Sequence, residues 1–417
     1  MKKHSYIILT SLFLSLGLII SGCAKEEPKE EVTISSDLKD KVRDDLSGKN
    51  DPVPNTETQT STETTTTVTE TVPAIDPAPS YEINNGSDTG IDTSAADAAA
   101  GKFDKKTVVG MVTDEGGIED QSFNQSAWEG LQWFSGTSGC NVIFLESKTN
   151  DDMEKNFEKL AKDGTTLIWG IGNTSGKPLS TVAAKYPDIK FAILDNENAS
   201  LGSNMTGVTF RSEEPGFIVG YIAGAVTKSN KVGFIGGVQS ASVDRFRYGY
   251  EAGVAYAGKQ LNKKITVNSE YAGSFSDTDK GYAAADKLYI DGADVIFHAA
   301  GGAGVGVIKS ATEHGAFVIG VDKDQAYLAP GNVLTSALKF ENVAIKKVSG
   351  DILSESYIGG SNISLGLTED AVGFSENHSL YSDDIYNKAL SLENEIKSGT
   401  LLPPSDANAL KAFTEGL

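Results

Sequence analysis

The feature that most constrains the fold of this 417-residue chain is a regular alternation of short apolar runs with helical patterns, which begins near residue 105. Most of the apolar runs are continuous, as is typical of strands covered on both faces. The expected strands are 107–112, 141–145, 165–169, 191–194, 208–210, 231–235, 265–271, 295–298, 317–321 and 333–336. Helical patterns separate most of them, and this succession predicts an α/β fold with parallel sheets.

About 310 residues follow the start of the alternation, which is too many for one comfortable hydrophobic core. We therefore expect two Rossmann-like lobes, the first mainly in residues 105–225 and the second mainly in 230–320. The turn Gly236-Gly237 directly follows an apolar strand and is the expected start of the second α/β unit.

Residues 1–22 predict a secretory signal peptide, because a basic start is followed by an apolar stretch too short to be a membrane span. The stretch closes with Ile20-Ser21-Gly22-Cys23, which resembles a bacterial lipobox. That pattern implies cleavage before Cys23 and acylation of Cys23, with a palmitate-type anchor. The chain would then be held at the outer side of a cell membrane. The alternative is an ordinary signal peptide with an incidental cysteine.

Residues 23–104 predict a disordered tether between Cys23 and the folded domain. They are rich in Glu, Asp, Thr, Pro and Ser and carry about half of the formal net charge of −21. So few large apolar side chains cannot offset the entropy cost of ordering the backbone. The negative charge also argues against a nucleic acid as partner.

A strand, a polar loop and a helix start follow one another over residues 108–130. In parallel α/β sheets this layout places ligand-binding groups at the carboxyl edge of the sheet. Asp114, Phe123 and Asn124 are the side chains expected to face a cleft there. No catalytic nucleophile accompanies them, and the four histidines show no metal-ligand spacing. The pattern therefore predicts a binding protein with no catalytic residues, no metal and no cofactor.

The segment from Asp120 to Gly130, DQSFNQSAWEG, resembles the opening motif of the basic membrane protein family of lipoproteins, also called the purine nucleoside receptor or PnrA-like family. Further matches follow in order at 191–195, 216–224, 299–306, 320–325 and 334–339. Members are substrate-binding subunits of ABC importers. The resemblance therefore implies a type I periplasmic-binding-protein fold over 105–417, with hinge crossovers between the lobes. It also implies ABC permease subunits as partners.

The resemblance further implies a purine nucleoside as ligand. Phe123 and Phe275 correspond to two aromatic residues that sandwich the purine ring, a contact worth on the order of 1–3 kcal/mol per base. Asp114 and Asp195 correspond to acids at the base edge, and Asn124 completes recognition of the base or the sugar. Without the resemblance, a core role for Phe123 and a helix-capping or turn role for the aspartates are the alternatives.

The same resemblance assigns a ribose site. Asp322 ends an expected strand, and its carboxylate could accept hydrogen bonds from both hydroxyls of a ribose diol. Lys339 corresponds to a sugar-contacting lysine, with an ordinary solvated lysine as the alternative. Gly301 and its neighbour Gly302 would let a main-chain N–H approach the 5′-hydroxyl side. The alternative for the glycines is a plain turn between strand and helix.

The candidate ligand groups are mostly acidic, which favours a nucleoside over a phosphate-bearing nucleotide. The glycine-rich segment 301–306 also lacks the ending of a phosphate-binding loop. Two other functions stay open. The chain could be a surface sensor or antigen that uses the same cleft, or a nucleoside hydrolase in which Asp114, Asp195 and Asp322 supply acid and base.

Overall fold

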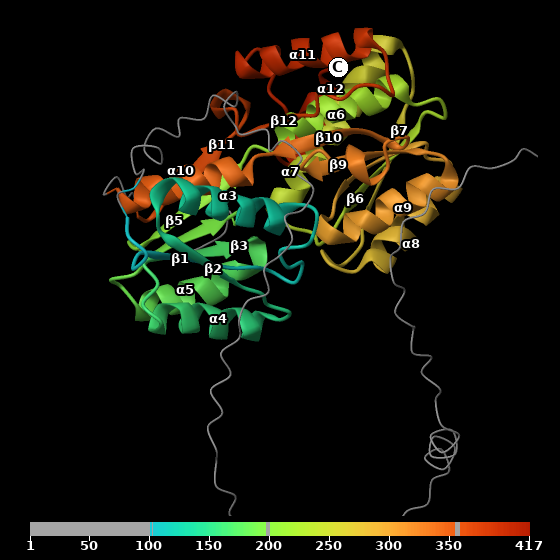
Figure 1. The fold of residues 1–417 in the computed structure, drawn as a ribbon. Coiled ribbons are helices and arrows are strands. Elements are labelled where there is room, and N and C mark those ends of the chain that lie inside the picture. Colours follow the sequence, from blue (N-terminus) through green and yellow to red (C-terminus); the bar gives the residue numbers. More distant parts are fainter. Residues whose placement is uncertain (1–100, 102, 197–200, 355–358) are drawn as a thin grey trace, which may run out of the picture. The chain divides into compact units, whose positions relative to one another are not determined.

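The structure, a computed structural model, describes residues 101, 103–196, 201–354 and 359–417. The predicted signal peptide, Cys23 and almost all of the predicted tether lie outside the described residues. Those that are described belong to one compact unit that contains two six-stranded sheets, each covered by helices (Figure 1). The expected α/β fold with two mostly parallel sheets is confirmed.

The first sheet is parallel throughout. In spatial order its strands are β11 (Ser361–Leu365), β5 (Met205–Phe210), β4 (Lys190–Leu194), β3 (Leu167–Ile171), β1 (Val108–Val112) and β2 (Asn141–Leu145). Its helices are α3 (Phe123–Ser138) and α10 (Glu341–Leu353) on one face, and α4 (Asn150–Lys162) and α5 (Gly176–Lys185) on the other (Figure 1). Buried apolar side chains fill both interfaces, so the central strands are apolar on both faces.

The second sheet has the same plan with one antiparallel edge. In spatial order its strands are β12 (Val372–Phe374), β10 (Val333–Lys339), β9 (Phe317–Asp322), β8 (Val295–Ala299), β6 (Lys231–Gly236) and β7 (Thr266–Tyr271), of which β12 runs antiparallel to β10. The α-helices of this lobe are α6 (Glu213–Val226), α7 (Ala241–Leu261), α8 (Thr278–Ile290), α9 (Gly304–His314), α11 (Asp383–Lys397) and α12 (Ala407–Glu415). Short 3-10 turns are η1 (Asn173–Ser175), η2 (Gly301–Ala303), η3 (Ala326–Leu328) and η4 (Leu367–Glu369).

The chain passes between the two sheets three times. The first crossing follows β5, the second lies at Phe340 between β10 and α10, and the third joins β11 to β12. Arg211, in the first crossing, lies 2.7 Å from Glu214 and 2.5 Å from Glu369 of the third. These ion pairs tie two of the crossings together.

Helix α6 packs on α7 and on β10 and β12 of the second sheet, whereas the expected first lobe ran to about residue 225. The packing is close because α7 presents glycines to α6. A Cβ atom at Gly253 would lie 2.0 Å from the carbonyl oxygen of Phe217, and one at Gly249 would lie 2.2 Å from that of Glu213. Only glycine permits this approach of two helix backbones. Within the described ranges, no helix combines the length and apolarity needed to cross a membrane.

Candidate functional site

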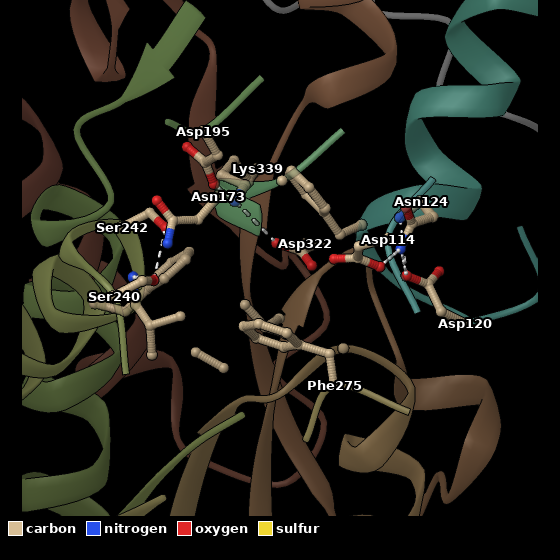
Figure 2. Close-up of a pocket in the computed structure, with 17 residues that line it drawn as sticks. Asp114, Asp120, Asn124, Asn173, Asp195, Ser240, Ser242, Phe275, Asp322 and Lys339 are labelled. Atoms are coloured by element: carbon tan, nitrogen blue, oxygen red, sulfur yellow. Dashed lines mark hydrogen bonds and ion pairs between the residues drawn. The ribbon is translucent and has the colours of Figure 1, made fainter. Parts of the chain in front are cut away.

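A cleft of about 550 Å³, including space open to solvent, lies between the two lobes at the carboxyl ends of their strands (Figure 2). The described residues that line it are Asp114, Asp120, Phe123, Asn124, Gly172, Asn173, Asp195, Ser240, Ser242, Val243, Phe246, Phe275, Ala299, Gly301, Val321, Asp322 and Lys339. All eight ligand contacts expected from the sequence are among them, so residues up to 225 positions apart meet at one cavity.

The strands of both sheets explain why these side chains meet. In the first lobe, Asp114 follows β1 and Asp195 follows β4. In the second lobe, Gly301 follows β8, while Asp322 and Lys339 are the last residues of β9 and β10. Parallel strands end at one edge of their sheet, and two such edges face each other across the cleft.

Asp195 and Asp322 share an unusual backbone. Their φ angles are +59° and +64°, in the left-handed region that most side chains avoid. Aspartate tolerates this region better than bulkier residues do, and such strain often accompanies functional sites. Each lobe therefore bends its chain sharply at an aspartate and presents a carboxylate to the cleft.

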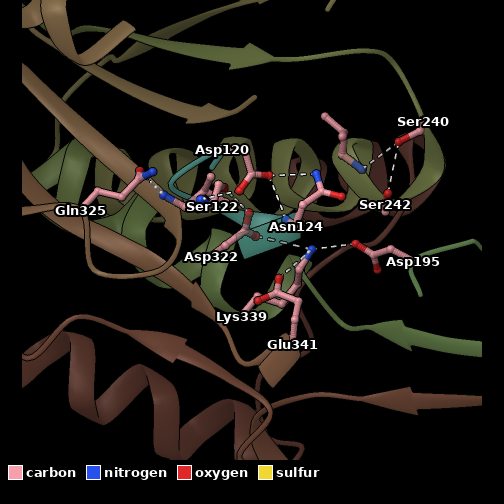
Figure 3. Close-up of polar contacts among 12 residues, drawn as sticks. Asp120, Ser122, Asn124, Asp195, Ser240, Ser242, Asp322, Gln325, Lys339 and Glu341 are labelled. Atoms are coloured by element: carbon pink, nitrogen blue, oxygen red, sulfur yellow. Dashed lines mark hydrogen bonds and ion pairs between the residues drawn. The ribbon is translucent and has the colours of Figure 1, made fainter. Parts of the chain in front are cut away.

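Lys339 links the lobes at the centre of the site (Figure 3). Its Nζ atom lies 2.6 Å from Asp195 Oδ2, 3.5 Å from Asp322 Oδ1 and 3.5 Å from Glu341 Oε1. It also lies 4.6 Å from the ring centroid of Phe123, within cation–π range. The side chain is only 4% exposed, which excludes the alternative of an ordinary solvated lysine.

Burial alone would lower the pKa of Lys339, but the carboxylates of Asp195, Asp322 and Glu341 outweigh it and raise the pKa. The lysine therefore stays charged. Burial, and then the nearby charge of Asp322, raise the pKa of Glu341 well above its usual value. One cation thus balances a cluster of buried acids.

Asp114, Asn124 and Asp120 form a second group, on the first lobe. Nδ2 of Asn124 donates to Asp114 Oδ1 at 2.8 Å and to Asp120 Oδ2 at 2.9 Å. Asp120 also accepts hydrogen bonds from the main-chain nitrogens of Ser122, Asn124 and Gln125 at the start of α3. Burial raises the pKa of Asp120, and it raises the pKa of Asp114 to about 6.

Phe275 lies on the polar loop after β7, and Figure 2 shows its ring at the cleft. The ring rests on Gly237, where a Cβ atom would lie 2.3 Å from it. Its main chain is held twice: the nitrogen donates to Glu115 Oε1 at 2.8 Å, and the oxygen accepts from Ala303 N at 3.0 Å. Ser274 Oγ also donates to Glu115 Oε1, at 2.9 Å. The ring is thus a half-buried cleft wall and not part of a separate core.

Further hydrogen bonds cross between the lobes. Ser122 Oγ donates to Asp322 Oδ2 at 2.5 Å, and Gln325 Nε2 donates to the carbonyl oxygen of Gln121 at 3.1 Å. Lys323 Nζ lies 2.6 Å from Glu129. The loop between β1 and α3 therefore contacts the second lobe while it also lines the cleft, and the structure is that of a closed cleft.

Sequence reasoning missed several lining residues. Asp120 lies inside the motif that drew attention to Phe123, and its position before a helix could have marked it. Ser240 and Ser242 begin α7, directly after the turn that follows β6, which is again the carboxyl edge of a sheet. Phe246 gives no such signal, because a phenylalanine inside a helix is more often core.

The charge of the lining limits what the cleft can bind. Four aspartates line it, and among the described lining residues Lys339 is the one base. In the described part of the chain, no three His, Cys, Asp or Glu side chains are grouped so that they could hold a metal ion. The arrangement offers hydrogen-bond acceptors, one buried cation and phenyl rings, and it disfavours anions.

Comparisons with known proteins agree with this architecture. The family described as ABC transporter substrate-binding protein PnrA-like matches residues 107–406. Basic membrane protein A of Borreliella afzelii is 38% identical over 310 residues, which cover 73% of this chain and 94% of that protein. The CD4+ T-cell-stimulating antigen of Listeria innocua is 37% identical over 328 residues, which cover 73% of this chain and 89% of that protein.

Among solved structures, a solute-binding protein of an ABC transporter system from Aeropyrum pernix superposes with a TM-score of 0.67. It is 26% identical, and the match covers 74% of this chain and 98% of that one. The family match spans the α/β part of the chain from β1 to the start of α12, and it confirms the resemblance found in the sequence. The chain belongs to the PnrA-like family of ABC transporter substrate-binding proteins.

Proposed function

We propose that this protein is the lipid-anchored substrate-binding component of an ABC importer and that it binds purine nucleosides in the cleft between its lobes. The observation that carries the proposal is the composition of that cleft. Phe123 and Phe275 line it from different lobes, and acidic side chains surround them. Phenyl rings suit the faces of a purine, and carboxylates suit its N–H groups and the hydroxyls of a ribose.

The individual roles follow the positions of the residues. Phe123 and Phe275 stack on the base, while Asp114, Asn124 and Asp195 contact polar atoms of the ligand. Asp322, Lys339 and a main-chain N–H at Gly301 bind the sugar. The left-handed backbone at Gly301, with φ +56°, supports such a close main-chain approach.

A nucleoside fits the cleft better than a nucleotide. Lys339 is already paired with Asp195 at 2.6 Å, so its charge is not available to a phosphate. The remaining carboxylates would repel an anion. A neutral ligand with hydroxyl and N–H donors meets neither obstacle.

The place of the protein in the cell is part of the proposal. The lipobox at Cys23 supports a diacylglyceryl and palmitoyl anchor that would hold the chain to the outer side of a cell membrane. The family supports ABC permease subunits as partners, to which a closed lobe pair would deliver its ligand. Mass spectrometry of the mature N-terminus tests the anchor, since an unmodified Cys23 would reject it.

Isothermal titration calorimetry with guanosine, inosine and adenosine tests the ligand class. We expect saturable one-to-one binding of at least one of them, and none of the corresponding 5′-monophosphates at the same concentration. Absence of heat, together with no shift in the unfolding temperature for any nucleoside, would reject the proposal. Chromatography of the same mixtures for free base tests the alternative of a nucleoside hydrolase.

A surface antigen or sensor is a second candidate, favoured by the Listeria innocua relative that is named a T-cell-stimulating antigen. The two roles predict different effects of gene deletions on nucleoside uptake. Import requires that deletion of the permease abolishes uptake of labelled nucleoside in the source organism. A sensor would leave uptake unchanged when this chain is deleted.

A further inference from the structure

The amide of Asn124 is held in one orientation by two acids. Both of its N–H groups are in use, one on Asp114 Oδ1 at 2.8 Å and the other on Asp120 Oδ2 at 2.9 Å. A flipped amide would place its oxygen against both carboxylates. Because a carboxylate offers no proton to that oxygen, the observed orientation is the stable one.

The other end of this amide is a buried acceptor. Asn124 is 2% exposed and lines the cleft, and its Oδ1 atom has no hydrogen-bond partner among the described residues. In Figure 3 the amide oxygen points away from Asp120. A buried acceptor without a partner costs free energy comparable to a lost hydrogen bond. A ligand N–H in the cleft would supply the missing partner.

Asp114 provides a second acceptor beside it. Its hydrogen bonds from Gly116 N and Asn124 Nδ2 both fall on Oδ1. Oδ2 takes part in none within the described ranges, and a Cβ atom at Gly172 would lie 3.0 Å from it. Figure 2 shows an Asp114 oxygen directed at the cleft. Glycine at 172 thus leaves this oxygen room to meet a ligand.

We infer that Asp120, by holding the Asn124 amide, makes this edge of the cleft a pair of acceptors and so selects purines with two neighbouring N–H donors. The inference rests on the proposed function and deepens it. The Watson–Crick edge of guanine offers two such donors, at N1 and the 2-amino group. Hypoxanthine offers only N1–H, and adenine places an N1 lone pair against the acceptors. Asp120 is a positioning residue, and Asn124 and Asp114 are the contacts.

Calorimetry at pH 8, with a series of nucleosides and the full-length protein in detergent, tests this inference. We expect guanosine to bind at least tenfold more tightly than inosine, and inosine more tightly than adenosine. 1-Methylguanosine, which lacks the N1–H donor, should bind at least tenfold more weakly than guanosine. Equal affinity for guanosine and adenosine overturns the inference but leaves the proposed function standing. Absence of binding by every nucleoside rejects the proposed function itself.

The variant Asp120→Ser tests the positioning role. The serine hydroxyl can still accept a hydrogen bond from a main-chain nitrogen before α3, as Asp120 does from Ser122, but it releases one N–H of Asn124 and lets the amide turn. We expect the ratio of guanosine to adenosine affinity to fall at least tenfold. Glu119→Ala, at an exposed acid of the same loop, should leave the ratio unchanged. An unchanged ratio in an Asp120→Ser protein that unfolds cooperatively overturns the role of Asp120. If that variant does not fold, the affinities of the nucleoside series still support or overturn the inference.

Discussion

The carboxylate of Glu115, in the first lobe, accepts a 2.8 Å hydrogen bond from the main-chain nitrogen of Phe275, in the second lobe. The same oxygen accepts a second hydrogen bond from Ser274 Oγ. Glu115 directly follows Asp114, which lines the cleft. Glu115, which binds the second lobe, is therefore adjacent to a candidate ligand contact. It also holds the loop that carries Phe275, the candidate stacking ring.

Glu115→Ala should speed nucleoside dissociation about tenfold or more, with a much smaller change in the association rate. Hydrogen bonds to a charged group are worth roughly 1.5–3 kcal/mol, and these two join the first lobe to the second. Stopped-flow fluorescence would give both rate constants. The matched control is Glu119→Ala. Equal dissociation rates for the two variants would show that the hydrogen bonds of Glu115 do not hold the closed state.

Phe275→Ala should weaken nucleoside binding by about 1–3 kcal/mol, because a base–aromatic stacking contact is lost. Little loss of stability is expected, since the ring is only half-buried on a loop. Tyr282→Ala, in α8 outside the cleft lining, serves as the aromatic control. Calorimetry measures the affinities, and an affinity like that of the control would place the ring outside the binding site.

Lys339→Met should destabilise the ligand-free protein by about 3–5 kcal/mol at pH 8, because it leaves buried carboxylates without their cation. Without the lysine, the buried carboxylates repel one another when they are ionised, and protonation relieves this repulsion. The loss of stability should therefore be largest at pH 8 and should shrink towards pH 5. Urea unfolding at several pH values measures it.

Lys159→Met is the control for that experiment. Lys159 pairs with Asp163, but both side chains are more than half exposed. Exposed pairs contribute little, so the control should change stability far less and show no such dependence on pH. A Lys339→Met protein as stable as this control would mean that the acid cluster does not need its lysine.

Guanosine affinity should fall as pH drops from 7.5 to 5. Burial raises the pKa of Asp114 to about 6 in the ligand-free protein, with further raising by Asp120 and Glu115. A ligand N–H bound to the carboxylate favours the ionised form, so binding competes with the proton below pH 6. Titrations in two buffers of different ionisation enthalpy should show proton release near pH 6. A pH-independent affinity would exclude Asp114 as a contact.

The raised pKa of Asp114 affects folding stability in the direction opposite to its effect on affinity. The folded protein holds a proton on Asp114 up to about pH 6, whereas the unfolded chain loses it near 3.8. The contribution of this residue to the stability of the ligand-free protein therefore declines as pH rises from about 4 to above 6. Thermal unfolding of the unmodified protein and of Asp114→Asn at several pH values isolates this contribution, since the stability of the variant should lack the decline.

Much of the fold could be predicted because its central strands are apolar on both faces. All ten expected strands are present, with ends within three residues of those expected. The strands β11 and β12 were not expected. β11 is an edge strand in which small polar residues alternate with apolar ones, and β12 has three residues. The C-terminal helices α11 and α12 were also not expected, and α12 contains no fully buried residue that would mark an apolar face.

The site could be predicted where a residue's role follows from its place at a strand end. Asp195 and Lys339 meet in the structure although 143 residues separate them in the sequence. Their direct ion pair could not be predicted, because it depends on how two lobes close. Phe246 was missed for a related reason: it lies inside α7, and only the tertiary arrangement brings it to the cleft.

The glycine contacts between α6 and α7 have a mechanical consequence. At Gly249 and Gly253 the two helix backbones touch directly, with no side chain between them that could slide or repack. We therefore expect the second lobe to rotate as one block and the bending to fall on the short stretches 211–212, 340 and 366–371. A methyl group at Gly253 would push α6 and α7 apart, so a change far from the ligand could prevent the two lobes from closing.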